Sequence, residues 1–119
     1  MEKQLLINKI TSILLDKKCK NVLAIDVSDK TDVTEAYVVC SARNPSAAKA
    51  AYEELCAKLE PEDEYTAGVD GLREGKWIVM DYGKVIVHIF HTSLRDLYQF
   101  EKLWSDEDGK NVTRYEDEE

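Results

Sequence analysis

The chain has 119 residues, enough for one domain that buries roughly two thirds of its unfolded surface without a disulfide or metal staple. Apolar residues make up 44% of the sequence, which predicts a folded chain, yet no apolar run approaches the ~20 residues of a membrane-spanning helix. The 24 acidic residues outnumber the 16 basic ones, so the surface as a whole repels nucleic-acid phosphates and suits a basic protein partner.

The first forty residues predict a helix followed by two strands. Apolar side chains recur at three- and four-residue spacing over residues 4–16, the pattern of a helix with one apolar face: Leu6, Ile7, Ile10, Ile13 and Leu14. Residues 22–27 and 36–41 predict short strands, separated by the polar loop 29–34. The unbroken apolar run in the second strand indicates that both of its faces are covered. No signal-peptide pattern precedes the helix, and we expect a cytoplasmic protein without a membrane partner.

A second helix is predicted over residues 45–59. Asn44 is a favourable N-cap, and Pro45 fits the first turn, where no backbone donor is lost. Pro61 is expected to end the helix. Its apolar stripe is small at one end, which allows close approach to a sheet: Ala48, Ala51, Leu55 and Leu59.

The remaining residues predict three strands and one helix. Residues 65–69 form a weak strand, and residues 77–81 and 85–90 form a hairpin with Tyr82-Gly83 near its tip. A helix is predicted over residues 94–104, and the acidic residues 107–119 are expected to be a mobile tail.

The order of these elements predicts the fold class. Helices interspersed with a partly antiparallel sheet indicate an α/β (α+β) domain, with a mixed five-stranded sheet flanked by helices. We expect this one domain to span residues 1–106 and the acidic tail to follow it.

The sequence offers few groups for catalysis or metal binding. Cys19, Cys40 and Cys56 are odd in number and widely spaced, so we interpret them as small apolar residues. His88 and His91 are three apart on a predicted strand, which sends their side chains to opposite faces. Without a nucleophile–base pair, a metal cluster or a phosphate loop, a binding protein is favoured over an enzyme.

The predicted hairpin carries candidate binding residues. Strand alternation places Trp77, Val79 and Asp81 on one face of the sheet. Trp77 is either a core residue near an edge or an anchor for a partner, since tryptophan is enriched at binding hot spots. Asp81 precedes a turn and is expected to cap it. Tyr82, at the turn itself, is expected to be exposed and to contact a partner.

The last predicted helix has two different sides. Its inward side is expected to hold Leu94, Leu97, Phe100, Leu103 and Trp104. Arg95, Tyr98, Glu101 and Lys102 recur at three- and four-residue spacing outside that stripe. The pattern is typical both of an ordinary amphipathic helix and of a docking surface.

Several motifs resemble a known family. The two longest are Trp77-x-x-x-Asp81-Tyr82-Gly83-x-Val85-x-Val87-His88-x-Phe90 and Arg95-x-x-Tyr98-x-x-Glu101-x-Leu103-Trp104. Two shorter ones are Asp16-Lys17-Lys18 and Tyr37-Val38-Val39-Cys40-Ser41, and Asp70-Gly71 stands where the family usually has Glu-Gly. Over residues 4–106 the chain is similar to the Iojap family, the bacterial ribosomal silencing factors.

The resemblance implies a fold akin to a nucleotidyltransferase without catalytic carboxylates. It implies binding to the large ribosomal subunit through its fourteenth protein, a steric block to small-subunit joining, and lowered translation when nutrients are scarce. Homodimers are a further implication, whereas no catalytic residue, cofactor or metal is expected. The candidate partner-binding residues are Asp70, Trp77, Asp81, Tyr82, His88, Arg95, Tyr98 and Lys102.

Two other functions would each need features that the sequence largely lacks. A nucleotidyltransferase-like enzyme or nucleotide-binding protein needs a close pair of carboxylates that hold magnesium ions after a Gly-Ser turn. Residues 40–44 lack that glycine, and Asp26 and Asp29 lie three apart before the turn. Direct RNA binding needs a basic stripe with interleaved aromatics. Only Lys17, Lys18 and Lys20 cluster, at a helix end, so we expect no more than incidental contact with ribosomal RNA.

Overall fold

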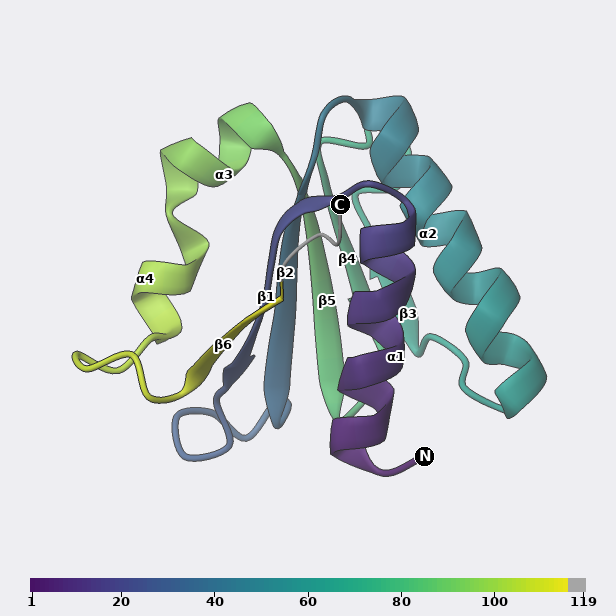
Figure 1. The fold of residues 1–119 in the computed structure, drawn as a ribbon. Helices are drawn as coiled ribbons and strands as arrows, with labels where there is room; N and C mark the ends of the chain where they lie inside the picture. The colour runs from purple at the N-terminus through teal and green to yellow at the C-terminus, as the bar shows by residue number, and fades with distance from the viewer. Residues whose placement is uncertain (116–119) are drawn as a thin grey trace.

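The computed structural model describes residues 1–115, apart from the side chain of Leu97. Within these residues, a six-stranded sheet has the order β3-β4-β5-β2-β1-β6 (Figure 1). β2 and β5 run parallel, and the other neighbouring strands are antiparallel. The strands are β1 (Lys20–Asp26), β2 (Ala36–Ala42), β3 (Gly68–Asp70), β4 (Trp77–Asp81), β5 (Val85–His91) and β6 (Val112–Tyr115).

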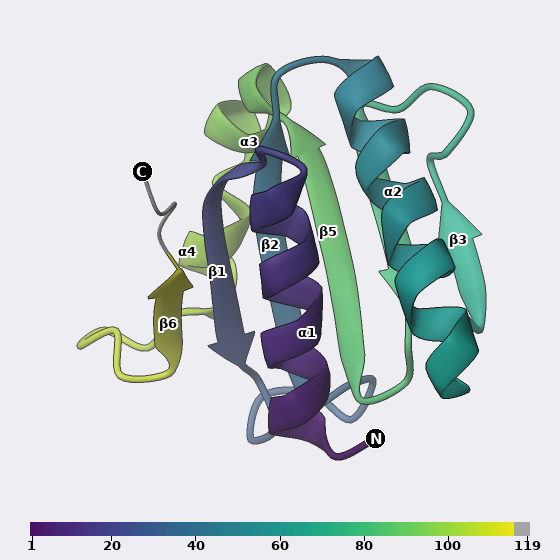
Figure 2. The same ribbon diagram turned by 45° about the vertical axis from the view of Figure 1, so that its right-hand side comes forward.

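Two long helices, α1 (Lys3–Asp16) and α2 (Pro45–Leu59), cover one face of the sheet (Figure 2). The predicted cap of α2 is confirmed, because Asn44 Oδ1 accepts a hydrogen bond from Ala47 N at 2.8 Å. The short 3-10 helix η1 (Glu60–Glu62) follows α2 directly. The predicted stripe of α2 is buried against the sheet as expected. Among the described residues, no helix is long and apolar enough to cross a membrane.

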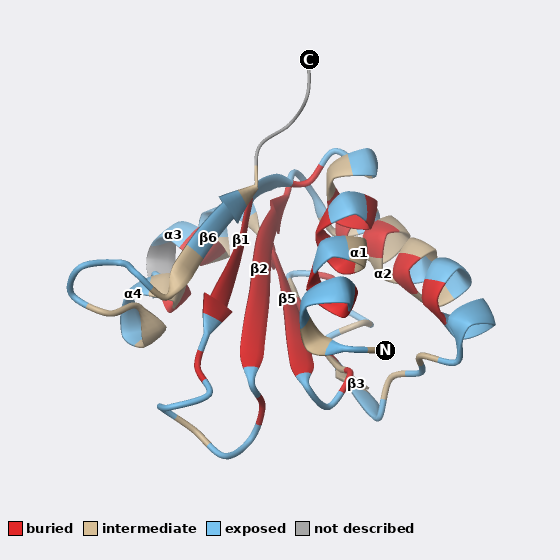
Figure 3. Cartoon of the chain, turned by 60° about the horizontal axis from the view of Figure 1, so that its bottom comes forward, coloured by how far each residue is buried: buried red, intermediate tan, exposed pale blue. Residues whose placement is uncertain are grey.

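Two short helices, α3 (Thr92–Tyr98) and α4 (Phe100–Trp104), lie on the other face of the sheet (Figure 1). α3 packs against β2 and β5. The central strands are therefore buried on both faces, as the apolar run in β2 predicts (Figure 3). On this same face, Trp77 and Val79 of β4 stay half-buried and Asp70 of β3 is exposed. Part of this sheet face is thus not covered by a helix.

The mixed α+β fold is confirmed, but the expected number of strands is wrong. Residues 112–115, expected in a mobile tail, form β6 and pair antiparallel with β1. β1 would otherwise be an edge strand with unpaired backbone groups. Asn111 holds the returning chain, because its Nδ2 donates to Asp26 O at 3.0 Å and to Trp104 O at 2.9 Å. The rest of the expected tail, residues 116–119, lies outside the described residues.

The prediction of a single helix over residues 94–104 is also wrong. It breaks at Gln99, which has φ 49° and ψ 48°, the left-handed conformation. The break turns Phe100 into the core, whereas Leu103, expected to face inward, is 75% exposed. Leu94 and Trp104 are half-buried as part of the inward side. Leu97, expected to face inward as well, has a side chain outside the described part of the chain.

Gln99→Gly is expected to raise the free energy of unfolding by about 0.5–1 kcal/mol, or roughly 2–4 °C in melting temperature. Glycine adopts the positive φ of residue 99 without the clash between Cβ and the backbone that glutamine has there. Thermal unfolding followed by circular dichroism measures the change. Gln99→Ala keeps the Cβ and is the control, for which no gain is expected. A loss of stability in Gln99→Gly would contradict the assignment of strain to this residue.

Candidate docking surface

The open part of the sheet face is built from β3 and β4. As predicted, Trp77, Val79 and Asp81 alternate with Ile78 and Met80, which are buried on the face of the sheet that α1 and α2 cover. Val79 lies opposite Asp70 on β3 in the antiparallel register. Directly opposed residues share a face, so Asp70 lies on the same face as Trp77.

Trp77 is fixed from beneath by the neighbouring strand β5. Its indole Nε1 donates a hydrogen bond to His88 Nδ1 at 3.0 Å. Its ring stacks on Phe90 with a centroid distance of 4.7 Å and an interplanar angle of 27°. It also contacts the ring of Tyr98, at a centroid distance of 5.3 Å. Tyr98 is 52% exposed, so a rigidly held tryptophan and an exposed tyrosine form one aromatic surface.

His88 was also a candidate partner-binding residue, but it is only 6% exposed and supports Trp77 from within the structure instead of facing a partner. Its ring lies 4.3 Å from Phe100 and 5.1 Å from Tyr37, between centroids. Because Nδ1 accepts from Trp77, the neutral ring carries its proton on Nε2, which has no hydrogen-bond partner among the described residues. Burial among aromatic rings lowers the pKa of His88 from 6.5 to about 4, since a charged imidazolium would lose its hydration there.

Acid is expected to weaken the fold through His88. The pKa of the folded state lies below that of the unfolded state, so between pH 6.5 and 4 the unfolded chain binds more protons. Lowering the pH from 6.5 to 4 therefore decreases the free energy of unfolding, by about 3 kcal/mol in total. Denaturant titrations at several pH values measure the slope. His88→Gln keeps an acceptor for Trp77 and is expected to flatten the slope; an unchanged slope would assign it to other groups.

Arg95 was a candidate partner-binding residue, but it is only 4% exposed. Its Nη1 donates to Asn21 O at 2.5 Å and to Ser41 Oγ at 3.1 Å, and its Nε lies 3.4 Å from Glu101 Oε1. Asn21 has φ 51° at a register shift in β1, which frees its carbonyl from the strand ladder. Arg95 therefore joins α3 to β1 and β2 and positions Tyr98, and its assignment to the docking surface is wrong.

Tyr82 was expected to be exposed at the hairpin tip, but it is buried on the opposite face, in the core between the sheet and the long helices. The alternation of β4 continues one step past its end, so Tyr82 follows Ile78 and Met80 into the core. That period of two was the signal that the sequence offered. Its hydroxyl has no partner among the described residues, and burial raises its pKa.

The other two candidates, Asp81 and Lys102, lie apart from the aromatic surface of Trp77 and Tyr98. Asp81 Oδ1 accepts from Gly83 N at 2.7 Å, which confirms the predicted turn cap. Lys102 is exposed on α4, beyond the break at Gln99. We define the docking surface as Asp70, Trp77, Val79 and Tyr98. The strand alternation predicts that Val79 lies on this face, but Val79 was not among the candidate binding residues.

Comparison with known proteins agrees with the resemblance of the motifs. The family described as "Ribosomal silencing factor during starvation" matches residues 1–119. This chain belongs to that family. Its members are ribosome-associated regulators of translation, a role that is regulatory rather than catalytic.

Relatives of this silencing-factor chain cover most of its length. Ribosomal silencing factor RsfS of Haemophilus influenzae is 31% identical over 88 residues, 74% of this chain and 86% of the relative. The Bacillus subtilis protein of the same name is 29% identical over 91 residues, 76% and 77% of the two chains. A crystal structure from Chromobacterium violaceum has a TM-score of 0.84 at 29% identity and covers 87% of each chain.

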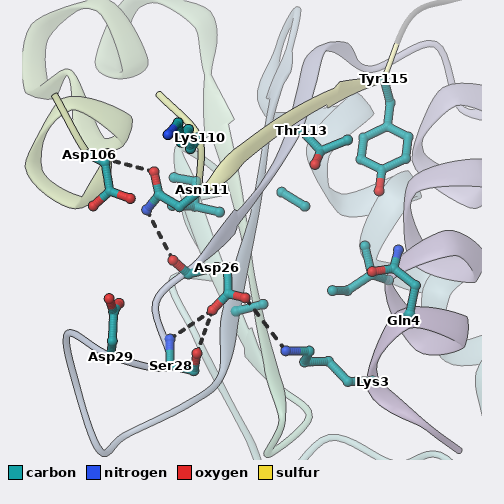
Figure 4. Close-up of a pocket in the computed structure, with 14 residues that line it drawn as sticks. Lys3, Gln4, Asp26, Ser28, Asp29, Asp106, Lys110, Asn111, Thr113 and Tyr115 are labelled. Carbon is teal, nitrogen blue, oxygen red and sulfur yellow. Dashed lines mark hydrogen bonds and ion pairs between the residues drawn. The ribbon is translucent and has the colours of Figure 1, made fainter. Parts of the chain in front are cut away.

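A second feature of this family member is a hollow of about 440 Å³ between the start of α1, the end of β1 and β6 (Figure 4). Asp26 on its wall accepts from Ser28 Oγ at 2.7 Å and Ser28 N at 3.0 Å and lies 3.7 Å from Lys3 Nζ. The hydrogen bond from the Ser28 hydroxyl is the main cause that lowers the pKa of Asp26. The polar groups around this carboxylate bond to one another and hold β6 to the sheet.

The hollow also bears on the enzyme alternative. Asp26 and Asp29, the carboxylates considered for magnesium, both line it. Asp26 is already engaged by Ser28 and Lys3, so the two carboxylates do not form a free, converging pair. Across residues 1–115, no group of three or more His, Cys, Asp or Glu side chains is placed to hold a metal ion.

Proposed function

We propose that this chain binds the large ribosomal subunit through its fourteenth ribosomal protein and blocks joining of the small subunit by its bulk. The observation that supports this most is the pairing of Trp77 and Tyr98 at the part of the sheet face that α3 and α4 leave uncovered. A partly exposed tryptophan held by a hydrogen bond and a stacked ring is pre-organised for binding, because little side-chain entropy is lost on contact.

The size and charge of the molecule fit a steric role at an interface. The body measures 34 × 33 × 31 Å, large enough to keep two subunit surfaces apart when it is seated between them. The net charge of -8 complements a basic ribosomal protein and accelerates association with it. Action would take place in the cytoplasm, under nutrient limitation, without a cofactor or catalytic step. A second copy of the chain is a further partner that the resemblance suggests.

Sedimentation tests the proposal directly. The protein is mixed with purified large subunits of Bacillus subtilis without added nucleotide and centrifuged through a sucrose cushion. Small subunits are then added, and whole ribosomes are scored on a gradient. Co-sedimentation and a dose-dependent loss of whole ribosomes are expected. Protein that stays at the top, or normal joining in saturating excess of it, would refute the proposal. Light scattering on the same sample gives the oligomeric state.

A further inference from the structure

The charges of this acidic chain are sorted between the two ends of the sheet. One end, uppermost in Figure 1, holds the α1–β1 turn, the start of α2, the β3–β4 loop and the β5–α3 junction. This end carries six cations, and we call the surface that they form the basic end: Lys17, Lys18, Arg43, Lys49, Arg73 and Lys76. Three carboxylates accompany them, Asp16, Asp70 and Glu74. The loops at the opposite end carry ten of the 24 acidic residues: Asp29, Asp32, Glu35, Glu60, Glu62, Asp63, Glu64, Asp106, Glu107 and Asp108.

Hydrogen bonds and close packing hold these segments together. His91 N at the end of β5 donates to Lys76 O at 2.7 Å, and Thr92 Oγ1 donates to Ala42 O, just before Arg43, at 3.2 Å. The β3–β4 loop lies so close to the first turns of α2 that a Cβ added at Gly75 would be 3.1 Å from Lys49 Cε. The basic end is therefore one continuous region, and Lys76 borders Trp77 of the docking surface.

The basic end also differs from the rest of the chain in how its charges are paired. Among residues 1–115, none of its six cations forms an ion pair, and Lys18, Arg43, Arg73 and Lys76 are exposed. Of the ten cations elsewhere, at least five form an ion pair within the described residues: Lys3 with Asp26 and Glu35, Lys9 with Glu62, Lys30 with Asp106, Arg95 with Glu101 and Lys110 with Asp108. Unpaired cations gathered at one end of an acidic protein are available to an external anion.

We propose that the basic end contacts the phosphate backbone of ribosomal RNA beside the protein that the docking surface binds. This inference rests on the proposed function. The cations come from several separate turns and spread over a broad area, which suits a chain of repeating phosphates. The aromatic side chains of Trp77 and Tyr98 belong to the neighbouring face, so the basic end contacts backbone without reading bases. The protein thus binds the subunit through two chemically different surfaces, the aromatic docking surface and the basic end.

Charge reversal tests this second surface. Arg43→Glu/Arg73→Glu/Lys76→Glu is compared with the unmodified chain in binding to large subunits of Bacillus subtilis, over a KCl series at fixed Mg²⁺. We expect affinity to fall by on the order of tenfold or more and the slope of log affinity against log salt to shrink by about 3, near one unit per lost phosphate contact. Binding to a protein-free RNA duplex, followed by fluorescence anisotropy, is expected to fall as well.

A matched variant separates a local contact from general repulsion. Lys58→Glu/Lys110→Glu/Arg114→Glu makes the same change in net charge with exposed residues outside the basic end. It is expected to bind subunits within about twofold of the unmodified chain. Equal weakening of both variants, or loss of subunit binding with unchanged duplex binding, would overturn the RNA contact and leave the proposed function intact. Failure of the unmodified chain to sediment would refute both.

Discussion

Tyr98→Ala is expected to weaken binding to the large ribosomal subunit by about 30-fold, the effect of a hot spot worth about 2 kcal/mol. Tyr98 is 52% exposed and rests on Trp77, so its ring presents apolar area to a partner at little cost in conformational entropy. Because the ring packs on one side only, the free energy of unfolding is expected to fall by less than about 1 kcal/mol. Sedimentation over a range of protein concentrations measures the affinity.

Tyr65→Ala is the matched control for this change. Tyr65 is 61% exposed, in the segment that leads into β3, and lies outside the docking surface. Its truncation removes the same atoms from another part of the surface and is expected to leave binding within about twofold. If Tyr98→Ala and Tyr65→Ala bind equally well, the partner contacts a different face and the docking surface is misplaced.

Arg95→Ala is expected to lower the free energy of unfolding by about 3 kcal/mol, or roughly 12 °C in melting temperature. The substitution removes the donors to Asn21 O and Ser41 Oγ and leaves the Glu101 carboxylate without its partner. Buried polar groups that lose a partner carry the full cost of their lost hydration. Subunit binding is expected to weaken too, because α3 carries Tyr98. Chemical denaturation and sedimentation measure the two effects.

Two variants test the reason for the Arg95 effect. Arg95→Lys keeps the charge but lacks the planar guanidinium, which donates to several acceptors at once. We therefore expect a decrease in the free energy of unfolding smaller than that of Arg95→Ala. Arg114→Ala, at an exposed arginine on β6, is expected to change the free energy of unfolding by less than about 0.5 kcal/mol. A loss in Arg95→Ala no larger than in Arg114→Ala would mean that the buried hydrogen bonds of Arg95 contribute little.

The sequence alone predicted the features that depend on neighbouring residues. The apolar stripes of α1 and α2, the Asn44 cap and the opposite faces of Trp77 and Ile78 follow from periods of 3.6 and 2 and from local capping chemistry. The motifs around the hairpin identified the family for the same reason, since they lie in short, continuous segments. In these segments the local chain geometry already decides where each side chain points.

Only the tertiary structure decided features that depend on distant segments. β6 forms because β1 offers an open edge, and Asn111 reaches Asp26 across 85 positions of sequence. Arg95 is buried because Asn21 and Ser41 present acceptors to it, 74 and 54 positions away. The helix periodicity around Arg95 is the same for a buried anchor and an exposed contact. Burial depends on which segments meet in space, and that is fixed by packing of the whole sheet.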